Sequence, residues 1–212
     1  MKNFVILTVI IGVLMFGTGF AHAISLELWN VFPDTQGDNG IYVYAYNGAT
    51  YRQLADLGSY YFGTPSAGFN IPYAERGTGT YPWVTWHPST SEDVRIAWMA
   101  PETNLYNLSG AFDNWGDGGD VNFYVKRNNA VLTMSSIQGN GYGISWFDID
   151  NISLNAGDVI YLGVNSRGDQ SNDTSRVRAC VEYAPVPEPA TMSLLGLGIA
   201  GLLGFRRKKR VF

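Results

Sequence analysis

The chain has 212 residues, of which 46% are hydrophobic and 15% charged, and its formal net charge at pH 7 is −4. Residues 24–184 hold 8 of the 14 cations and 17 of the 18 acids, which speaks against nucleic acid as a partner because phosphate binding requires positive charge. A single cysteine and two histidines exclude an internal disulfide framework and a zinc site built from several cysteines or histidines.

The first residues have the order of a secretory signal peptide. Lys2 is followed by an apolar stretch at 4–20 and then by Ala21-His22-Ala23, which has the small-residue pattern of a cleavage site. We expect residues 1–23 to be removed and the mature chain to begin at Ile24. The alternative is an uncleaved N-terminal anchor, because the apolar stretch is long for a signal peptide.

Residues 24–184 have the size of one domain with a sizeable core, and their pattern is that of β-strands. Apolar and polar residues alternate, turn-forming residues interrupt them at short intervals, and no stretch has a convincing helical period. Each alternating segment is expected to bury one face and expose the other; the clearest are 94–99, 121–126 and 160–164. Asn128-Asn129 predicts a hairpin, because asparagine tolerates positive φ, and residues 155–158 predict another turn.

About ten short strands in this length favour an all-β fold, an antiparallel β-sandwich of jelly-roll type. Trp98-Met99-Ala100-Pro101, the acidic loop 113–120 and the segment 155–161 resemble the jelly-roll, carbohydrate-binding-like domains of exported proteins. This resemblance covers residues 86–183 and implies the fold. A fold alone implies no activity.

Four aromatic residues are the candidate sugar contacts. Tyr42, Tyr44 and Tyr46 share one face of a predicted strand whose other face is aliphatic, so the sequence predicts an exposed row of rings that suits stacking on a sugar. Trp115, among small and acidic residues, is the second candidate. The alternative is that the tyrosines pack inward or fill an interface between sheets.

Three carboxylates in the same loop suggest a calcium site. Asp113, Asp117 and Asp120 lie on a glycine-rich stretch that calcium can gather, although the spacing is not that of an EF-hand. An acidic surface turn without metal is the alternative. No other cofactor is expected.

The last predicted strand separates two faces. Val177, Ala179, Val181 and Tyr183 point one way, and Arg176, Arg178, Cys180 and Glu182 point the other way. A thiol on the polar face allows a disulfide between two copies in an oxidising exterior, with a half-covered, unreactive thiol as the alternative.

The C-terminal residues have the order of a sorting tail. Val186, Pro187, Glu188 and Pro189 precede an apolar run at 190–205, which covers about 24 Å as a helix and is therefore slightly short for a bilayer. Five cations follow it and are expected to keep that end in the cytoplasm; they are Arg206, Arg207, Lys208, Lys209 and Arg210.

This tail resembles the PEP-CTERM sorting tail of bacterial exported proteins. The resemblance implies recognition of Pro187-Glu188-Pro189 by an exosortase-type processing enzyme, removal of the tail, and delivery to the cell surface or extracellular matrix. A GPI signal ends in its hydrophobic stretch and lacks the basic terminus. We therefore expect a signal peptide at 1–23, a β-sandwich ectodomain at 24–184, and a sorting tail at 185–212 whose helix at 190–205 anchors it in the inner membrane.

These observations predict an exported, noncatalytic surface or matrix protein, with extracellular polysaccharide as the expected partner. Two other classes remain open. One is a purely structural surface protein, and the other is a glycosidase, which needs two carboxylates roughly 5 to 10 Å apart. No motif selects such a pair from the candidates Asp113, Asp117, Asp148 and Asp150.

Overall fold

The computed structural model describes residues 25–65, 72–77, 82–115, 119–138, 143–167, 173–183 and 197–198. Residues 24–184 form one compact unit. The predicted signal peptide lies outside the described residues, as does the predicted helix at 190–205 apart from Leu197 and Gly198. Where the chain is described, no helix has the length and apolar character needed to cross a membrane.

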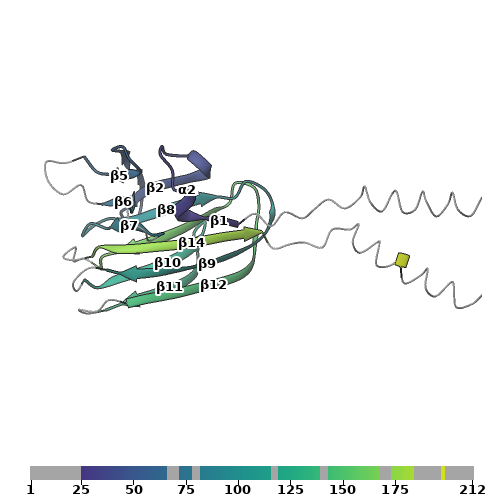
Figure 1. Cartoon of the computed structure of the whole chain (residues 1–212). Coiled ribbons are helices and arrows are strands. Elements are labelled where there is room, and N and C mark those ends of the chain that lie inside the picture. Colours follow the sequence, from purple (N-terminus) through teal and green to yellow (C-terminus); the bar gives the residue numbers. More distant parts are fainter. Residues whose placement is uncertain are drawn as a thin grey trace, which may run out of the picture. The chain divides into compact units, whose positions relative to one another are not determined.

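The described part of residues 24–184 consists mainly of antiparallel β-strands (Figure 1). It has one short α-helix, α2 (Leu28–Val31), and one 3-10 helix, Asp38–Gly40. The strands are β1 (Ser25–Glu27), β2 (Ile41–Tyr46), β3 (Tyr51–Gln53), β4 (Ala55–Asp56), β5 (Tyr61–Gly63), β6 (Tyr73–Arg76), β7 (Val84–His87), β8 (Asp93–Met99), β9 (Asn104–Asn114), β10 (Val121–Arg127), β11 (Ala130–Ile137), β12 (Gly143–Leu154), β13 (Val159–Asn165) and β14 (Ser175–Tyr183).

These strands form two sheets. The eight-stranded sheet has the order β12-β9-β14-β7-β6-β5-β4, with β1 also paired to β14, and the six-stranded sheet has the order β11-β10-β13-β8-β2-β3. The strand β14, yellow-green in Figure 1, therefore lies in the interior of the larger sheet between β9 and β7.

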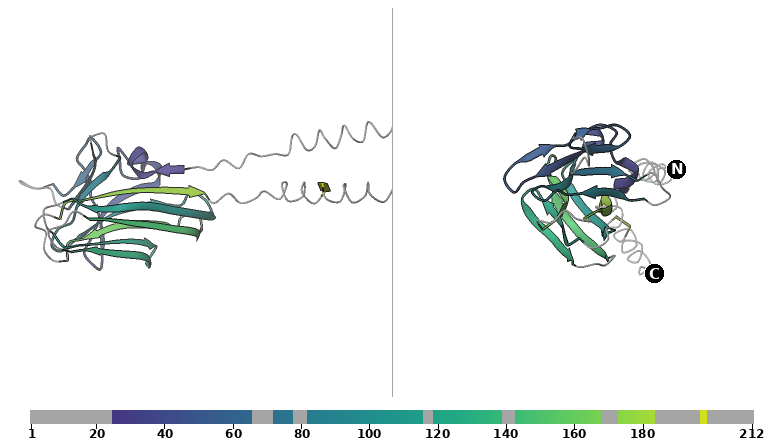
Figure 2. Two further views of the ribbon diagram at one scale, coloured as in Figure 1. Left: turned by 60° about the horizontal axis from the view of Figure 1, so that its bottom comes forward. Right: turned by 90° about the vertical axis from the view of Figure 1, so that its left-hand side faces the viewer.

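One hydrophobic core lies between the two sheets, which appear as two curved layers in the end-on view of Figure 2. Its centre contains stacked aromatic rings: Phe112 of β9 and Phe123 of β10 are 4.9 Å apart between ring centroids, and Trp86 of β7 stacks on both. These contacts join one sheet to the other. The predicted all-β antiparallel fold is confirmed, although the described residues contain fourteen strands where about ten were expected.

The alternation in β2 and β14 is confirmed. Ile41, Val43 and Ala45 are fully buried, whereas the tyrosines between them are half-buried on the outer face. In β14, the apolar residues Val177 and Val181 are buried in the core and the intervening polar residues point outward.

The expectation of one solvated face was wrong for β8. Val94, Ile96 and Trp98 are buried as predicted, but Arg95 and Ala97, which point away from the core, are also only 2% exposed. Side chains from neighbouring strands of the six-stranded sheet cover this outer face.

Both predicted turns are present. Asn128 has φ 51° and connects β10 to β11, which pair as a hairpin. Gly157 has φ 88° in the turn between β12 and β13. Asparagine and glycine adopt this left-handed backbone at little cost, which is why these positions end their strands.

Candidate functional site

The outer face of the six-stranded sheet carries a cluster of tyrosines, here called the tyrosine face: Tyr42, Tyr44, Tyr46, Tyr51 and Tyr161. Tyr42 and Tyr44 stack with ring centroids 6.2 Å apart, and Tyr51 packs against Tyr46 at 4.7 Å and Tyr161 at 5.5 Å. Burial and the neighbouring Tyr51 raise the pKa of Tyr161 to about 12. The predicted row of tyrosines therefore faces outward, but its rings pack on one another.

Arg95 ties the tyrosine face together. Its guanidinium lies 3.5 Å from the Tyr46 ring centroid and donates hydrogen bonds to the hydroxyl oxygens of Tyr124 and Tyr51. The Tyr124 hydroxyl in turn donates to Asp93 Oδ2 at 2.6 Å. Burial, with the Asp93 carboxylate, raises the pKa of Tyr124. Much of the hydrogen-bonding capacity of this face is therefore used internally.

Tyr124 lies over a glycine on the same face. Gly163 of β13 is directly opposite Tyr124 in the register, and a Cβ at Gly163 would overlap the Tyr124 ring. Glycine therefore makes room for the ring that Arg95 and Asp93 hold.

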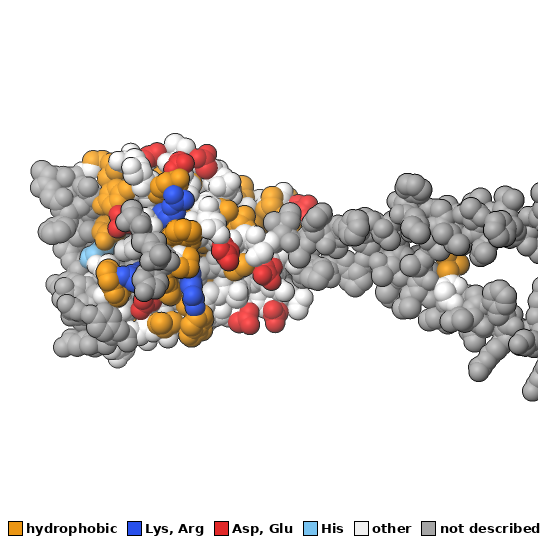
Figure 3. Space-filling model, viewed as in Figure 1, with side chains coloured by type: hydrophobic (Ala, Val, Ile, Leu, Met, Phe, Trp, Pro, Cys, Tyr) orange, Lys and Arg blue, Asp and Glu red, His pale blue; other side chains and the backbone are white. Residues whose placement is uncertain are grey.

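The outer face of the eight-stranded sheet has a different character. A groove of about 570 Å³ lies over β12, β9, β14 and β1, and its walls include Trp146, Trp29 and Pro82. Trp146 is 65% exposed. In Figure 3, cationic side chains (blue) lie among hydrophobic ones (orange) over β14 and its neighbours, and acidic side chains (red) lie toward the end of that strand.

Strand register arranges the groove in rows across the sheet. Trp146 of β12 and Arg178 of β14 both pair with Ala111 of β9, so these three side chains form one row. The next row, two residues further along, consists of Asp148, Ser109, Cys180 and Glu27. The groove thus combines an exposed indole with a guanidinium, a hydroxyl and two carboxylates.

The groove exists because the central strand carries small residues. Ser109, Gly110 and Ala111 of β9 run between the larger side chains of β12 and β14. Gly110 points toward the core, where a Cβ would overlap the Arg178 carbonyl oxygen and the Phe147 ring. Close approach of the three strands therefore requires glycine at this position.

Sequence reasoning did not select Trp146. Its strand has large residues on both faces, since Phe147 is buried in the core while Ile144 and Trp146 are exposed. The available signal was the run of small residues Ser109-Gly110-Ala111. This run predicts the floor of a groove only when the strands on either side of it are known. Those neighbours are distant in sequence, so the register was needed to find the groove.

Trp115 is exposed as predicted, at 51%. Its ring lies under the Arg176 guanidinium, with the Arg176 Cζ atom 3.3 Å from a ring centroid. Asp113 pairs with Arg176 across the strands. Burial raises the pKa of Asp113, and Arg176 opposes this shift.

The calcium hypothesis is not supported by the described carboxylates. Asp113 faces Arg176 and Asp120 forms an ion pair of 3.5 Å with Arg167, while Asp117 lies outside the described residues. Within the described ranges, no group of three or more His, Cys, Asp or Glu side chains is placed to hold a metal ion. A calcium site that uses Asp117 stays a prediction.

The glycosidase candidates are partly placed. Asp113 pairs with Ile144, so Asp148 lies four residues along the neighbouring strand, roughly 13 Å away, which is beyond the required separation. Asp148 and Asp150, two residues apart on β12, have a nominal spacing of roughly 7 Å. Both side chains are exposed, whereas a general acid needs surroundings that disfavour its charge.

Cys180 lies half-buried in the floor of the groove. Burial raises the pKa of its thiol, Glu182 and Glu27 raise it further, and the hydrogen bond with Ser25 opposes them. Its sulfur is 3.0 Å from Ser25 Oγ. These surroundings favour the neutral, unreactive thiol over the thiolate.

We expect iodoacetamide to alkylate Cys180 at least several-fold more slowly in the folded protein than in urea at the same pH. The reason is that a raised thiol pKa and partial cover both lower the concentration of accessible thiolate. Mass spectrometry over time measures the rate, and the urea sample is the control. Equal rates, or a dimer on non-reducing electrophoresis, would contradict this expectation.

Comparison with known proteins identifies one segment. Residues 185–208 match the PEP-CTERM protein-sorting motif. No curated protein matches the chain. Among solved structures, the chain is similar to a GH26-CBM35 β-(1,4)-mannanase of Podospora anserina, with 20% identity and a TM-score of 0.36 over 71% of this chain and 29% of that chain.

Two carbohydrate-binding modules are also similar. A family 61 module in complex with β-1,4-galactotriose has 14% identity and a TM-score of 0.35 over 66% of this chain and 86% of its own. A family 29 module has 12% identity and a TM-score of 0.39 over 76% and 89%. At these TM-scores, what those proteins bind carries no weight for this chain.

The order of parts in the C-terminal segment and the motif match agree. The match begins at Pro185, includes Val186 to Pro189 and the apolar run, and ends at Lys208 within the cations. Residues 185–208 are a PEP-CTERM protein-sorting motif, which indicates export and surface sorting.

Proposed function

We propose that residues 24–184 are a noncatalytic, polysaccharide-binding jelly-roll module of an exported surface or matrix protein. The observation that carries the proposal is the groove beside the exposed Trp146. Strand order supports the jelly-roll assignment: β7 to β14 contribute β12-β9-β14-β7 to one sheet and β11-β10-β13-β8 to the other.

The chemistry of the groove suits a sugar. An indole face supplies a flat apolar surface for the C–H side of a pyranose ring, and its exposure means that stacking removes apolar area from water. Asp148, Ser109 and Glu27 lie in the adjacent row and offer acceptors for sugar hydroxyls. A mostly apolar cleft with a few polar groups is the usual form of a binding site.

The tyrosine face remains a second candidate surface. Tyr42, Tyr44 and Tyr46 are only half-buried, so parts of their rings are accessible. Their neighbour Tyr51 and the buried Tyr124 already bond Arg95, which leaves fewer polar groups for a ligand there. This difference favours the groove as the principal site.

For the tail, we propose the course that its motif implies. The signal peptide at 1–23 directs export, the helix at 190–205 holds the protein in the inner membrane, and an exosortase-type enzyme recognises Pro187-Glu188-Pro189 and removes the tail. The match at residues 185–208 supports this course. Expressing the chain with Glu188→Ala and following the size and location of the product tests it.

We expect Trp146→Ala to weaken polysaccharide binding by about 30-fold or more. The reason is that a central exposed indole contributes about 2 kcal/mol or more to the binding free energy in such sites. Glycan arrays on residues 24–184, which form a separate unit, identify the ligand, and calorimetry measures its affinity with and without calcium.

The control is Met134→Ala, because Met134 is also exposed, at 66%, but lies on β11 of the other sheet. Equal losses of affinity in Trp146→Ala and Met134→Ala, or no binding to any glycan, would contradict the proposal. The purely structural surface protein would then be favoured. Release of shortened glycan would instead favour the glycosidase. Loss of binding on removing calcium would revive the site that includes Asp117.

A further inference from the structure

Arg178 stands beside the exposed indole of the groove. Its Cζ atom is 4.5 Å from a Trp146 ring centroid and 5.0 Å from a Trp83 ring centroid, so aromatic rings flank the guanidinium. Stacking of this kind uses the face of the guanidinium and leaves its N–H edge available. Arg178 also lines the groove itself.

The arginines of the described residues fall into two groups. Arg52, Arg95 and Arg167 each pair with a carboxylate, and Arg127 donates to the Ser153 carbonyl. The second group consists of Arg76, Arg176 and Arg178, which contact aromatic rings and, among the described residues, have no carboxylate within 4.0 Å. Trp29, near Arg76, and Trp146, near Arg178, both line the groove, whereas Trp115 under Arg176 is not part of its lining.

Arg176 gives this arrangement a second cation. It lies two residues from Arg178 on the same face of β14, roughly 7 Å away, with Trp115 under its guanidinium. Burial lowers the pKa of Arg176 and outweighs the opposing effect of Asp113. Asp113 faces Arg176 across the strands but forms no ion pair within 4.0 Å, and a partly desolvated guanidinium in that state gains more from an anion than one in open water.

We propose that the groove binds a polysaccharide bearing an anionic substituent, a carboxylate or a sulfate, which pairs with Arg178 while the sugar ring stacks on Trp146. The inference rests on the proposed sugar-binding function and names its ligand class. A guanidinium edge matches either oxyanion with two parallel hydrogen bonds.

The acidic row orients such a ligand. Asp148 lies two residues after Trp146 on β12. Glu27 pairs with Cys180, which lies two residues after Arg178 on β14. They repel the anionic substituent from that end of the groove and accept hydrogen bonds from the neutral hydroxyls. In Figure 3, several acidic side chains (red) lie toward the end of β14.

The test compares oligogalacturonate with its methyl ester, which keeps the rings and removes the charge, and dextran sulfate with dextran. Calorimetry on the wild-type unit should show binding of at least one anionic probe about 10-fold to 100-fold tighter than its neutral counterpart. Arg178→Gln should abolish this preference, and Arg178→Lys should retain part of it. Binding of the anionic probe should also weaken as salt rises.

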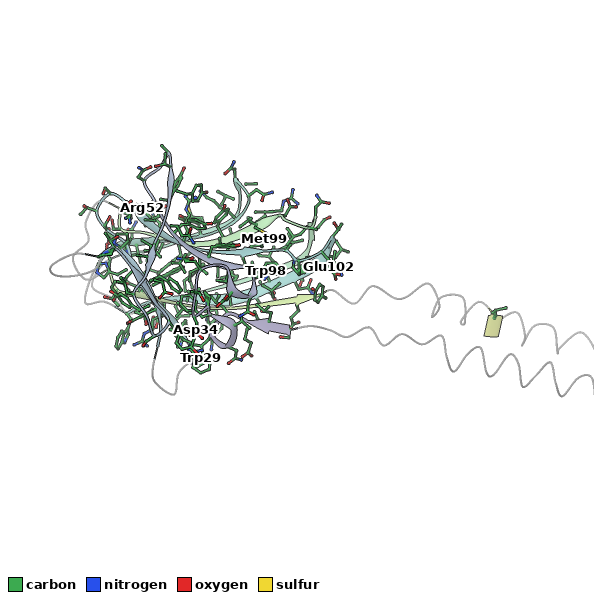
Figure 4. The ribbon with its side chains drawn as sticks, turned by 90° about the horizontal axis from the view of Figure 1, so that it is seen from above. Trp29, Asp34, Arg52, Trp98, Met99 and Glu102 are labelled. Atoms are coloured by element: carbon green, nitrogen blue, oxygen red, sulfur yellow. The ribbon has the colours of Figure 1, made fainter. Side chains whose placement is uncertain are left out.

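The control for charge is Arg52→Gln. Arg52 lies on β3 of the other sheet, and Figure 4 places it toward the opposite side of the module from Trp29, which lines the groove. Thermal unfolding verifies that each variant is folded. If Arg178→Gln does not fold, the affinities of Arg178→Lys and the salt dependence of the wild-type unit test the inference instead.

The outcomes separate the inference from the function on which it rests. Equal affinity for charged and neutral probes, or equal losses from Arg178→Gln and Arg52→Gln, overturns the anion inference. If neutral glycans bind and Trp146→Ala removes that binding, the proposed sugar-binding function stands without the anion inference. If none of the probes and no arrayed glycan binds, both are overturned.

Discussion

Replacing Arg95 with alanine is expected to lower the free energy of unfolding by about 3 to 5 kcal/mol. Arg95 is 2% exposed, and its guanidinium bonds the hydroxyls of Tyr124 and Tyr51 and neighbours Asp93. Without it, the Asp93 carboxylate loses its cation and the ring of Tyr46 loses the group on which it packs. Breaking a buried charge network costs more than the network contributes, because the remaining groups are left unpaired.

Urea unfolding of the separate unit measures this loss. Arg52→Ala is the matched control, because the Arg52 side chain is 44% exposed and its ion pair with Glu92 lies at the surface. We expect a change of at most about 1 kcal/mol there. A similar loss in the two variants would mean that Arg95 contributes no more than an ordinary surface pair.

Alternation was the part of the fold that could be predicted from the sequence. In β2, aliphatic residues at Ile41, Val43 and Ala45 required one buried face whatever the partner strands were, and that face is buried. Asn128 likewise predicted its turn from a local property of asparagine. The number of strands was underestimated, because strands as short as β3 to β6, with two to four residues each, are too short to show a period.

The outer face of β8 could not be predicted, because its cover comes from elsewhere. Arg95 has the alternation of a solvated residue, yet rings from β2, β3, β10 and β13 enclose it. Strand order and register decide which rings contact Arg95, and these rings come from segments up to 66 residues away from it in the chain. A single sequence contains no direct record of that pairing.

The candidate sites divide in the same way. The sorting motif at 185–208 is contiguous and was found by its order of parts. Trp115 was selected because its neighbours are small and acidic, and it is exposed. The groove combines β12, β9, β14 and β1, so Trp146 and Arg178 become neighbours only through the register.

Replacing Gly110 with alanine is expected to destabilise the module by about 2 to 3 kcal/mol, although the same change in a strand normally stabilises it. Alanine restricts the unfolded chain more than glycine, which ordinarily favours the folded state by about 0.5 to 1 kcal/mol. At Gly110 the added Cβ would overlap the backbone oxygen of Arg178 and the ring of Phe147. A backbone carbonyl in the centre of a sheet has little room to move, so the overpacking cost exceeds the entropic gain.

The comparison that isolates this effect is Gly143→Ala on β12. A Cβ there would meet the side-chain atoms of Ile137, the nearest at 3.0 Å, and a side chain can rotate away where a backbone cannot. We therefore expect less than about 1 kcal/mol from Gly143→Ala, measured by the same urea unfolding. Because β9 forms the floor of the groove, the displacement of this strand in Gly110→Ala should lower ligand affinity together with stability. A stable Gly110→Ala protein would show that β9 and β14 are not packed as closely as the register requires.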